Sequence, residues 1–525
     1  MKTLQGIFAV ATTLILVSAC NTNAPEVPTY KNVVVIVGDD HAYTTLGAYG
    51  NKQIRTPHLD ELAGEGVRFT NAYATSPLCS ASRQSLLTGK YPHQTGVSLL
   101  FTPFNDATNT TIAEHLKPEG FSTGLFGKAH FNSFIWWELY NGDLPHFGFD
   151  TLVDNAQYRQ WLVENPQPPI PDSIATYNRS HSGDNHAYRM NADVLPQPVD
   201  DAHSQGTFLA RSAINFIKEQ GDNRFLVWLA FHEPHAPFAF PIEYRNRYHP
   251  DSMPLPAGSP EDDRWIPERF RDFTERERRG IIASYYTSVE YMDSNVGRVM
   301  DALEKQGILD ETLVVYLGDQ GYLLNDHKRF EKHTMWAESI KAPLIFRGAG
   351  LPENREEKAI VEFTDVAPTL CELLDVPPME EASGTGLAPL LTGQTDQGKP
   401  YAFAEFLEDN KAMIATRKWK YIFTTGKRDL GQGYQTGHGP SGIYHRLYNL
   451  QNDPGETTNL AYKDSHGKVV DSLQHLMLDH FKTTHPYADE LPVQLNDTGK
   501  LVWFCEPRDV GAEYGGKPLR TFTPE

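Results

Sequence analysis

The chain has little cysteine, no long apolar stretch at its start and little positive charge. Two of its four cysteines, Cys371 and Cys505, stand so far apart among the 525 residues that no disulfide can be deduced from them. The mostly apolar run at 7–17 is too short to span a bilayer. A formal net charge of −20 argues against nucleic acid as a partner. An anionic substrate would therefore need a local basic pocket.

The first twenty residues have the pattern of a targeting segment. Lys2 precedes the apolar run, which ends in Val-Ser-Ala and then Cys20. This ending resembles a bacterial lipobox, which would make Cys20 the lipidated first residue of the mature protein; an ordinary cleaved signal is the alternative. Asn21 favours sorting to the outer membrane. We predict a lipoprotein signal peptide over 1–20, a tether over 21–30 and a lipid anchor that holds an exported protein in the periplasm or at the outer membrane or cell surface.

The length suggests two domains, or one large domain with an appendage. Apolar runs typical of buried parallel strands occur at 32–37, 120–126, 225–231 and 312–317, and helical patterns occur at 56–63, 204–219 and 278–306. This alternation predicts an α/β fold with a large, mainly parallel sheet sandwiched by helices. Two polar, proline-containing stretches, 154–205 and 241–275, are interpreted as insertions over the mouth of the site.

A different pattern begins after about residue 393. Short strands are expected at 401–406, 412–416 and 420–424, and a helix is expected over 469–483. We predict a catalytic domain over 31–395 and a smaller C-terminal subdomain over 396–525 that contains an antiparallel sheet and a helix. The last forty or so residues have no recognisable pattern.

Each of the four predicted parallel strands is followed by polar residues. Ligands bind outside the carboxyl ends of the strands in open α/β sheets, so these ends predict an active site. The carboxylates of Asp39, Asp40 and Asp319 could not all stay ionised together without a cation. With the amide of Gln320 they offer only oxygen ligands, which suit Ca²⁺ or Mg²⁺. A helix cap or a loop is the alternative for an Asp-Asp pair.

The segment CSASRQSLLTG at 79–89 has the most specific pattern in the chain. Cys79 is followed by Ala81 and Arg83, then by two leucines and Thr-Gly. It resembles the maturation signature of the type I, formylglycine-dependent sulfatases of the alkaline phosphatase superfamily, in which many members have proline where Ala81 stands. The resemblance extends over about 31–485. It implies that a maturation enzyme oxidises Cys79 to formylglycine, which acts as its hydrate; a buried structural thiol is the alternative.

The resemblance also implies a role for each polar residue. The cation would be calcium rather than magnesium, although Gln320 stands where members usually have asparagine or histidine. Arg83 would fix the hydrate on residue 79. Sulfate oxygens would be gripped by two lysines, which are Lys128 and Lys332, with Lys328 as the second choice for the latter.

Two histidines would move the protons. By family position His235 would protonate the leaving alcohol, and His130 would take the proton from the hydrate when sulfate is released. Further side chains near these motifs are candidates for contacts with the substrate, although the aromatic ones suit core packing equally well. They are His41, Trp136, Trp137, His181, His186, Arg189, His232 and His333.

The phrases FHEPHAPFAFP and EKHTMWAESIKAPLIF resemble the iduronate-2-sulfatase-like branch of the family. We therefore expect an exported sulfatase that acts on a sulfated polysaccharide or its oligosaccharides. Three alternatives stay open: a phosphonate or phosphate monoester hydrolase of the same superfamily, a sulfatase for small aryl or choline esters, and a glycan-binding lipoprotein without turnover.

Overall fold

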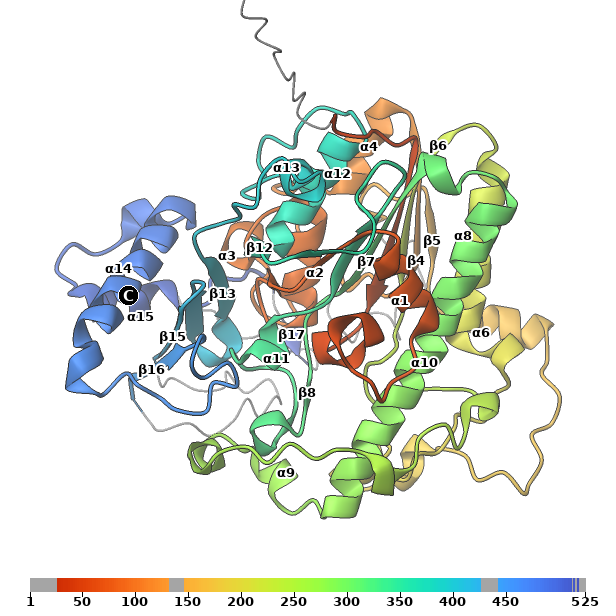
Figure 1. Ribbon diagram of the computed structural model, residues 1–525, viewed down its shortest axis with the longest axis horizontal. Helices are drawn as coiled ribbons and strands as arrows, with labels where there is room; N and C mark the ends of the chain where they lie inside the picture. The colour runs from red at the N-terminus through yellow and green to blue at the C-terminus, as the bar shows by residue number, and fades with distance from the viewer. Residues whose placement is uncertain (1–25, 132–145, 426–441, 512, 515–516, 519–525) are drawn as a thin grey trace, which may run out of the picture.

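The computed structural model describes residues 26–131, 146–425, 442–511, 513–514 and 517–518. Its centre is an eight-stranded sheet in which β10 alone runs antiparallel to the other strands (Figure 1). The order across the sheet is β11 (Arg355–Glu357), β2 (Val67–Phe69), β10 (Leu344–Arg347), β7 (Thr312–Gly318), β1 (Asn32–Gly38), β6 (Arg224–Ala230), β4 (Phe121–Gly127) and β5 (Thr151–Val153).

Helices cover both faces of this sheet, which is why its central strands are apolar throughout. Val33, Val35 and Val37 of β1 point into one core with α2 (Cys79–Thr88) and α12 (Val366–Leu373). Val34 and Ile36 point into a second core with α1 (Pro57–Gly64), α8 (Gln205–Gln220) and α10 (Glu275–Lys305). Successive side chains of a strand point to opposite faces, so a strand between two cores needs an unbroken apolar run.

The four predicted parallel strands and the three predicted helices are all present, and the predicted fold class is confirmed. The outer strands β11, β2 and β10 on one side and β5 on the other were not predicted because each has only three or four residues. The helix α6 (Asn155–Glu164) lies within the stretch interpreted as an insertion. It has no fully buried residue and hence little of the apolar periodicity that a sequence reveals.

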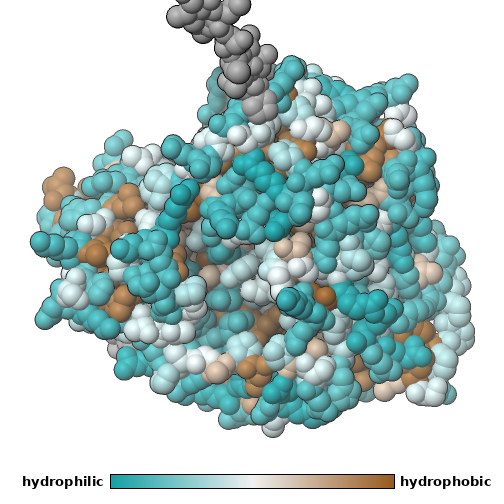
Figure 2. Space-filling view, viewed as in Figure 1, coloured by the Kyte–Doolittle hydropathy of each residue, from teal (hydrophilic) through white to brown (hydrophobic). Residues whose placement is uncertain are grey.

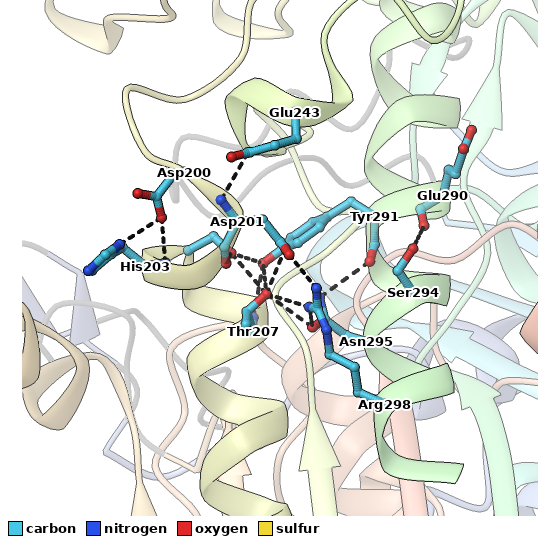
Figure 3. A network of polar contacts seen from close by, with 11 residues as sticks. Asp200, Asp201, His203, Thr207, Glu243, Glu290, Tyr291, Ser294, Asn295 and Arg298 are labelled. Atoms are coloured by element: carbon cyan, nitrogen blue, oxygen red, sulfur yellow. Dashed lines mark hydrogen bonds and ion pairs between the residues drawn. The ribbon is translucent and has the colours of Figure 1, made fainter. Parts of the chain in front are cut away.

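A polar network ties this insertion to the body of the protein (Figure 3). Thr207 of α8 donates to Asp201 Oδ1 at 2.9 Å, and Arg298 of α10 donates to the hydroxyl of Thr207 at 2.6 Å and pairs with Asp201. From the other side, the backbone N–H of Asp201 donates to the carboxylate of Glu243 at 2.9 Å. The insertion is therefore held at its C-terminal end by two core helices.

The C-terminal part of the chain forms a separate lobe, drawn in blue in Figure 1. Its antiparallel sheet has the order β13 (Ala402–Phe406), β14 (Lys411–Ala415), β15 (Trp419–Thr424) and β16 (Tyr444–Asn449). Two helices, α14 (Gly467–Thr484) and α15 (Asp497–Phe504), share one hydrophobic cluster with it. The helix α14 was predicted, whereas β16 and α15 were not. Cys505 of this cluster and Cys371 of α12 are both free and buried.

The face seen in Figure 2 is mainly hydrophilic, with hydrophobic residues in scattered small groups. Among the described ranges, none of the helices combines the length and the apolar character needed to cross a bilayer.

The packing of α10 against the insertion yields a stability prediction. A methyl group added at Gly280 would lie 1.9 Å from the backbone oxygen of Ala192, whereas one added at Gly64, the last residue of α1, would meet nothing within 4 Å. We expect Gly280→Ala to lower the free energy of unfolding by about 1–3 kcal/mol through overpacking. We expect Gly64→Ala to raise it by up to about 1 kcal/mol, since alanine is the better helix former. Denaturation midpoints in urea measure both, and a neutral or stabilising Gly280→Ala would contradict this packing.

Candidate active site

Four adjacent strands end at one edge of the sheet and carry the predicted polar residues with them. Gly38 of β1 pairs with Gly318 of β7, and Gly127 of β4 pairs with Ala230 of β6, so the four ends are level. The residues next in the chain after these ends therefore meet at one place. They are Asp39 and Asp40 after β1, Asp319 and Gln320 after β7, Lys128 and His130 after β4, and the segment 232–235 after β6.

Three carboxylates form the centre of the site. Oxygen atoms of Asp39, Asp40 and Asp319 lie within 4.8 Å of one another, and all three residues are buried. The backbone N–H of Asp40 donates to Asp319 Oδ1 at 2.9 Å, which fixes the two strand ends to each other. Gln320 donates its amide N–H to Asp40, and among the described residues neither Gln320 Oε1 nor Asp39 Oδ1, both buried, has a hydrogen-bond partner. Unpartnered buried oxygens beside carboxylates suit a hard cation.

Three basic side chains surround these acids. Arg83 Nε donates to Asp319 Oδ2 at 2.8 Å, and Lys128 Nζ donates to Asp39 Oδ2 at 2.6 Å. Lys332 forms a buried ion pair with Asp40. The formal charges of the three acids and the three bases cancel, which allows the cluster to stay ionised while buried.

The acids nevertheless differ in their proton affinity. Burial opposes ionisation of Asp39, but the charges of Lys128, His235 and Arg83 hold its pKa well below the usual range. Burial raises the pKa of Asp319 to about 6, although Arg83 opposes the shift. A divalent cation at this site would favour the ionised form of both carboxylates.

Cys79 is the first residue of α2 and faces this cluster. Its side chain is buried, and burial raises the pKa of its thiol despite the nearby charges of Lys128 and Lys332. The unmodified thiol is therefore protonated at neutral pH and a poor nucleophile. Arg83 lies one helical turn further along the same face, so the spacing of the motif places its guanidinium beside residue 79. The helix start also offers free N–H groups to an anion.

The two candidate proton carriers have different environments. His235 is partly exposed; its Nδ1 lies 2.8 Å from the carbonyl oxygen of Ala236, and its Nε2 lies 3.7 Å from Asp40 Oδ2. His130 is half-buried, but both of its ring nitrogens are inaccessible to solvent and neither has a hydrogen-bond partner among the described residues. Burial and the charges of Lys128 and Arg83 hold the pKa of His130 well below the usual range, so its ring is neutral and able to accept a proton.

The other candidates lie at varying positions around this centre. His41 is buried and His232 is half-buried, and desolvation lowers the pKa of each ring to about 3. His333 is buried and stacks on Phe406, while His186 lies 3.4 Å from the carboxylate of Glu331, the neighbour of Lys332. The side chains of His181 and Arg189 form hydrogen bonds with Asn178, Ser182 and Gly183, all of which lie in the insertion. Their roles in substrate binding stay predictions. Trp136, Trp137 and Cys20 lie outside the described residues.

The structure also distinguishes between the two lysines considered for the second sulfate contact. Lys332 reaches the carboxylate cluster, whereas Lys328 Nζ lies 2.7 Å from Asp263 Oδ1 in a more exposed ion pair. Of these two lysines, Lys332 is thus the one placed beside the acids.

Sequence reasoning missed Glu233, Ser82 and Gln84. Glu233 accepts the backbone N–H of Asp39 through its own carbonyl oxygen at 3.0 Å, and its carboxyl group is buried, which raises its pKa to about 7. Ser82 Oγ donates to the carbonyl oxygen of Asp319 at 2.5 Å, and Gln84 Nε2 donates to that of His130 at 2.9 Å. All three residues lie within the segments 232–235 and 79–89, which the sequence analysis had singled out. Their position next to predicted site residues is the feature that could have identified them.

Comparisons with known proteins agree with this geometry. The family model described as "Sulfatase" matches residues 31–376, and one described as "N-sulphoglucosamine sulphohydrolase, C-terminal" matches residues 325–483. An N-acetylglucosamine-6-O-sulfatase of Bacteroides thetaiotaomicron is 25% identical over 90% of both chains. An ulvan-active sulfatase of Formosa agariphila is 29% identical over 83% of this chain and 78% of its own.

Solved structures share the fold. The phosphonate monoester hydrolase of Agrobacterium radiobacter superposes with a TM-score of 0.72 at 23% identity, over 89% of this chain and 98% of its own. At this identity the likeness concerns the arrangement of the chain and leaves the reaction open.

Proposed function

Because the chain belongs to the sulfatase family and is a sulfuric ester hydrolase, we propose that it releases sulfate from a sulfated polysaccharide or its oligosaccharides. The observation that carries the proposal is the buried cluster of Asp39, Asp40 and Asp319 against Arg83 and two lysines, placed directly beside Cys79.

The charges of this cluster favour a monoanionic substrate. Three acids and three bases cancel, and a divalent cation would add two positive charges. A sulfate ester carries one negative charge, and one ionised hydroxyl on residue 79 would supply the second. The dianion of a phosphate monoester would leave one negative charge in excess, which is costly in a buried site.

The residues present fit the two groups that the family uses. Asp39, Asp40, Asp319 and Gln320 would hold calcium, or magnesium as the second choice, because they offer oxygen ligands only. The cation lowers the pKa of a hydroxyl near it, and formylglycine derived from Cys79 supplies a hydroxyl-bearing nucleophile where the thiol is inert.

Orientation of residue 79, stabilisation of the sulfate charge and proton transfer would fall to other side chains of the site. Arg83 orients residue 79 from the same helix face, and Lys128 and Lys332 stabilise the charge on the sulfate oxygens. Because Nδ1 of His235 donates its N–H to the carbonyl oxygen of Ala236, a second proton on Nε2, the nitrogen that faces the carboxylates, makes the ring an imidazolium cation. It would donate this proton to the leaving alcohol. His130, whose ring is neutral, would accept a proton during release of sulfate.

The substrate class is proposed from the relatives. One is named for N-acetylglucosamine 6-O-sulfate and another for ulvan, and both are carbohydrates. The finer assignment to the iduronate-2-sulfatase-like branch stays a prediction. Export as a lipoprotein anchored through Cys20, and a formylglycine-generating maturation partner, belong to the same proposal. The masses of the N-terminal peptide and of the Cys79 peptide from the native host test the two modifications.

A phosphonate monoester hydrolase is the second candidate. It has one supporting observation: the fold is shared with such an enzyme, whose substrate is also a monoanion. Free sulfate, phosphate and phosphonate should be measured after incubation with glycosaminoglycan, ulvan, carrageenan and fucoidan oligosaccharides and with aryl sulfate, aryl phosphate and aryl phosphonate esters. The proposal expects sulfate from at least one glycan. Turnover of the phosphonate ester alone would favour the second candidate.

Removal of the cation is expected to destabilise the protein as well as to stop turnover. Calcium at about 100 times its dissociation constant should add about 2.7 kcal/mol to the stability of the folded state. Thermal unfolding with EDTA, with Ca²⁺ and with Mg²⁺ measures the shift. Asp319→Asn, which keeps the shape of the side chain, should abolish the shift of the thermal midpoint that Ca²⁺ causes. An unchanged midpoint in the wild-type protein would contradict a cation at this cluster.

A further inference from the structure

A second cleft opens at the same edge of the sheet as the active site. It has a volume of about 570 Å³, and its lining includes Asn71 after β2, Lys341 before β10 and Lys358 after β11. Since β10 runs antiparallel to the other strands, its start lies level with the ends of β2 and β7, and Leu344 pairs with both Phe69 and Leu317. Strands lie about 4.8 Å apart, so the cleft is roughly 10–15 Å along the edge from Asp319.

Lys341 has the features of a ligand-binding lysine. Its Nζ lies 4.8 Å from the ring centroid of Tyr43 and 5.9 Å from that of Tyr73, and it donates to Asn71 Oδ1 at 3.1 Å. It has no carboxylate ion-pair partner among the described residues. Two of its three N–H groups are thus left for another acceptor. Such a partly buried ammonium group, held over aromatic rings, is preorganised to bind an anion.

The carboxylates around the cleft are mostly engaged elsewhere. Glu456 pairs with the buried Lys420 at 2.8 Å, and Glu357 pairs with Arg355 at 2.7 Å. Asp396 is exposed on the rim, where its backbone oxygen accepts a hydrogen bond from Arg417 at 3.4 Å. Lys341 is therefore a positive charge within the cleft that no carboxylate of the described residues pairs, on a chain with a net charge of −20.

The cations continue beyond Lys341 along the rim. Lys358, which also pairs with Glu356 at 3.3 Å, and Arg417 line the same cleft, and Arg417 lines a neighbouring depression together with Lys418. Both Arg417 and Lys418 lie in the turn between β14 and β15, so the C-terminal lobe supplies one side of this row of cations. A row of cations on an acidic protein concentrates the local potential and attracts an extended polyanion.

We propose that this cleft binds an acidic sugar unit of the same glycan chain from which sulfate is removed in the active site. The carboxylate or sulfate group of that unit lies against Lys341 and Asn71, and the following units contact Arg417 and Lys358. The proposal rests on the proposed function, since it assigns the cleft to the same substrate, but binding at the cleft does not require turnover.

The test measures binding on protein that cannot react. Fluorescence anisotropy of labelled heparin octasaccharide and labelled ulvan oligosaccharides is recorded with Cys79→Ala protein, alone and combined with Lys341→Met and Arg417→Met. We expect at least one probe to bind to the Cys79→Ala protein. Because charge-assisted hydrogen bonds are the strong ones, the two added substitutions should raise the dissociation constant of that probe about tenfold or more. The side chain of Arg417 is exposed, so Arg417→Met alone leaves the packing intact. This single substitution should weaken binding of the probe by a smaller factor than the double substitution.

Lys218→Met combined with Lys305→Met is the matched control, because it removes two exposed positive charges at the ends of α8 and α10, which precede the starts of β6 and β7 at the opposite edge of the sheet. The control should bind as tightly as the parent. Equal affinity in the cleft variant and the control, or no binding of either probe, would overturn the proposal. Oligosaccharides with reduced carboxyl groups or without sulfate distinguish which anion Lys341 binds.

Turnover by formylglycine-bearing protein separates the two proposals. The cleft variant should keep its kcat/KM for 4-nitrophenyl sulfate within about twofold while losing efficiency on the oligosaccharide. Oligosaccharide binding through Lys341 without any sulfate release would leave the cleft in place and refute the proposed function. Equal sulfate release from the oligosaccharide by the parent and the cleft variant would refute the cleft proposal and leave the proposed function in place.

Discussion

Replacement of Cys79 by alanine is expected to lower kcat for sulfate release by about 10⁴-fold or more, since removing a nucleophile costs most of the rate enhancement. Cys79 starts α2 beside Arg83, Lys128 and Lys332, so no other described side chain is placed to act in its stead. The alanine fits the buried position, and the fold should be retained. Initial rates on the preferred glycan, with the thermal midpoint beside them, measure the effect.

Cys371→Ala is the matched control for this prediction. Cys371 is likewise free and buried, but it lies in α12 within the hydrophobic core. Its replacement should cost some stability and leave kcat unchanged. Comparable activity in the Cys79→Ala protein and the wild type would refute the assignment of residue 79.

Replacement of His235 by alanine should have an effect that depends on the leaving group. A proton donor typically contributes about 10²–10⁴-fold when the leaving group is a poor one, such as a sugar alcohol. The phenolate of 4-nitrophenyl sulfate departs without being protonated, so the same variant should lose little kcat on that ester. The ratio of kcat on the two substrates is the measurement.

This comparison also separates catalysis from structure. His235 contacts Asp40 and Ala236, and a purely structural loss would lower both rates alike. Equal losses on the sugar sulfate and on the aryl sulfate would therefore remove His235 from the role of acid and direct attention to another group.

The convergence of the acidic and basic side chains could be predicted because it depends on a local rule. Asp39, Lys128, His235 and Asp319 each come shortly after an apolar run, and parallel strands bring the residues beyond their carboxyl ends to one edge of the sheet. The geometry within the cluster could not be predicted. That Lys332 rather than Lys328 faces Asp40, and that the ring nitrogens of His130 are inaccessible to solvent, depends on side-chain packing that no spacing encodes.

The cleft around Lys341 was invisible in the sequence for a related reason. Asn71, Lys341 and Arg417 are widely separated along the chain, and strands β2 and β10, which bring the first two together, have three and four residues. Runs of that length leave no periodic signal. Long-range pairing alone creates this surface, so only the fold reveals it.

The most direct test of the proposed chemistry relates activity to the chemical state of residue 79. Protein should be produced with graded amounts of a formylglycine-generating enzyme, and the converted fraction of the Cys79 peptide should be measured by mass and plotted against the rate of sulfate release from a responsive glycan. We predict a straight line through the origin, because burial keeps the unmodified thiol protonated and inert. Full activity in protein whose Cys79 is entirely unconverted would contradict the formylglycine mechanism.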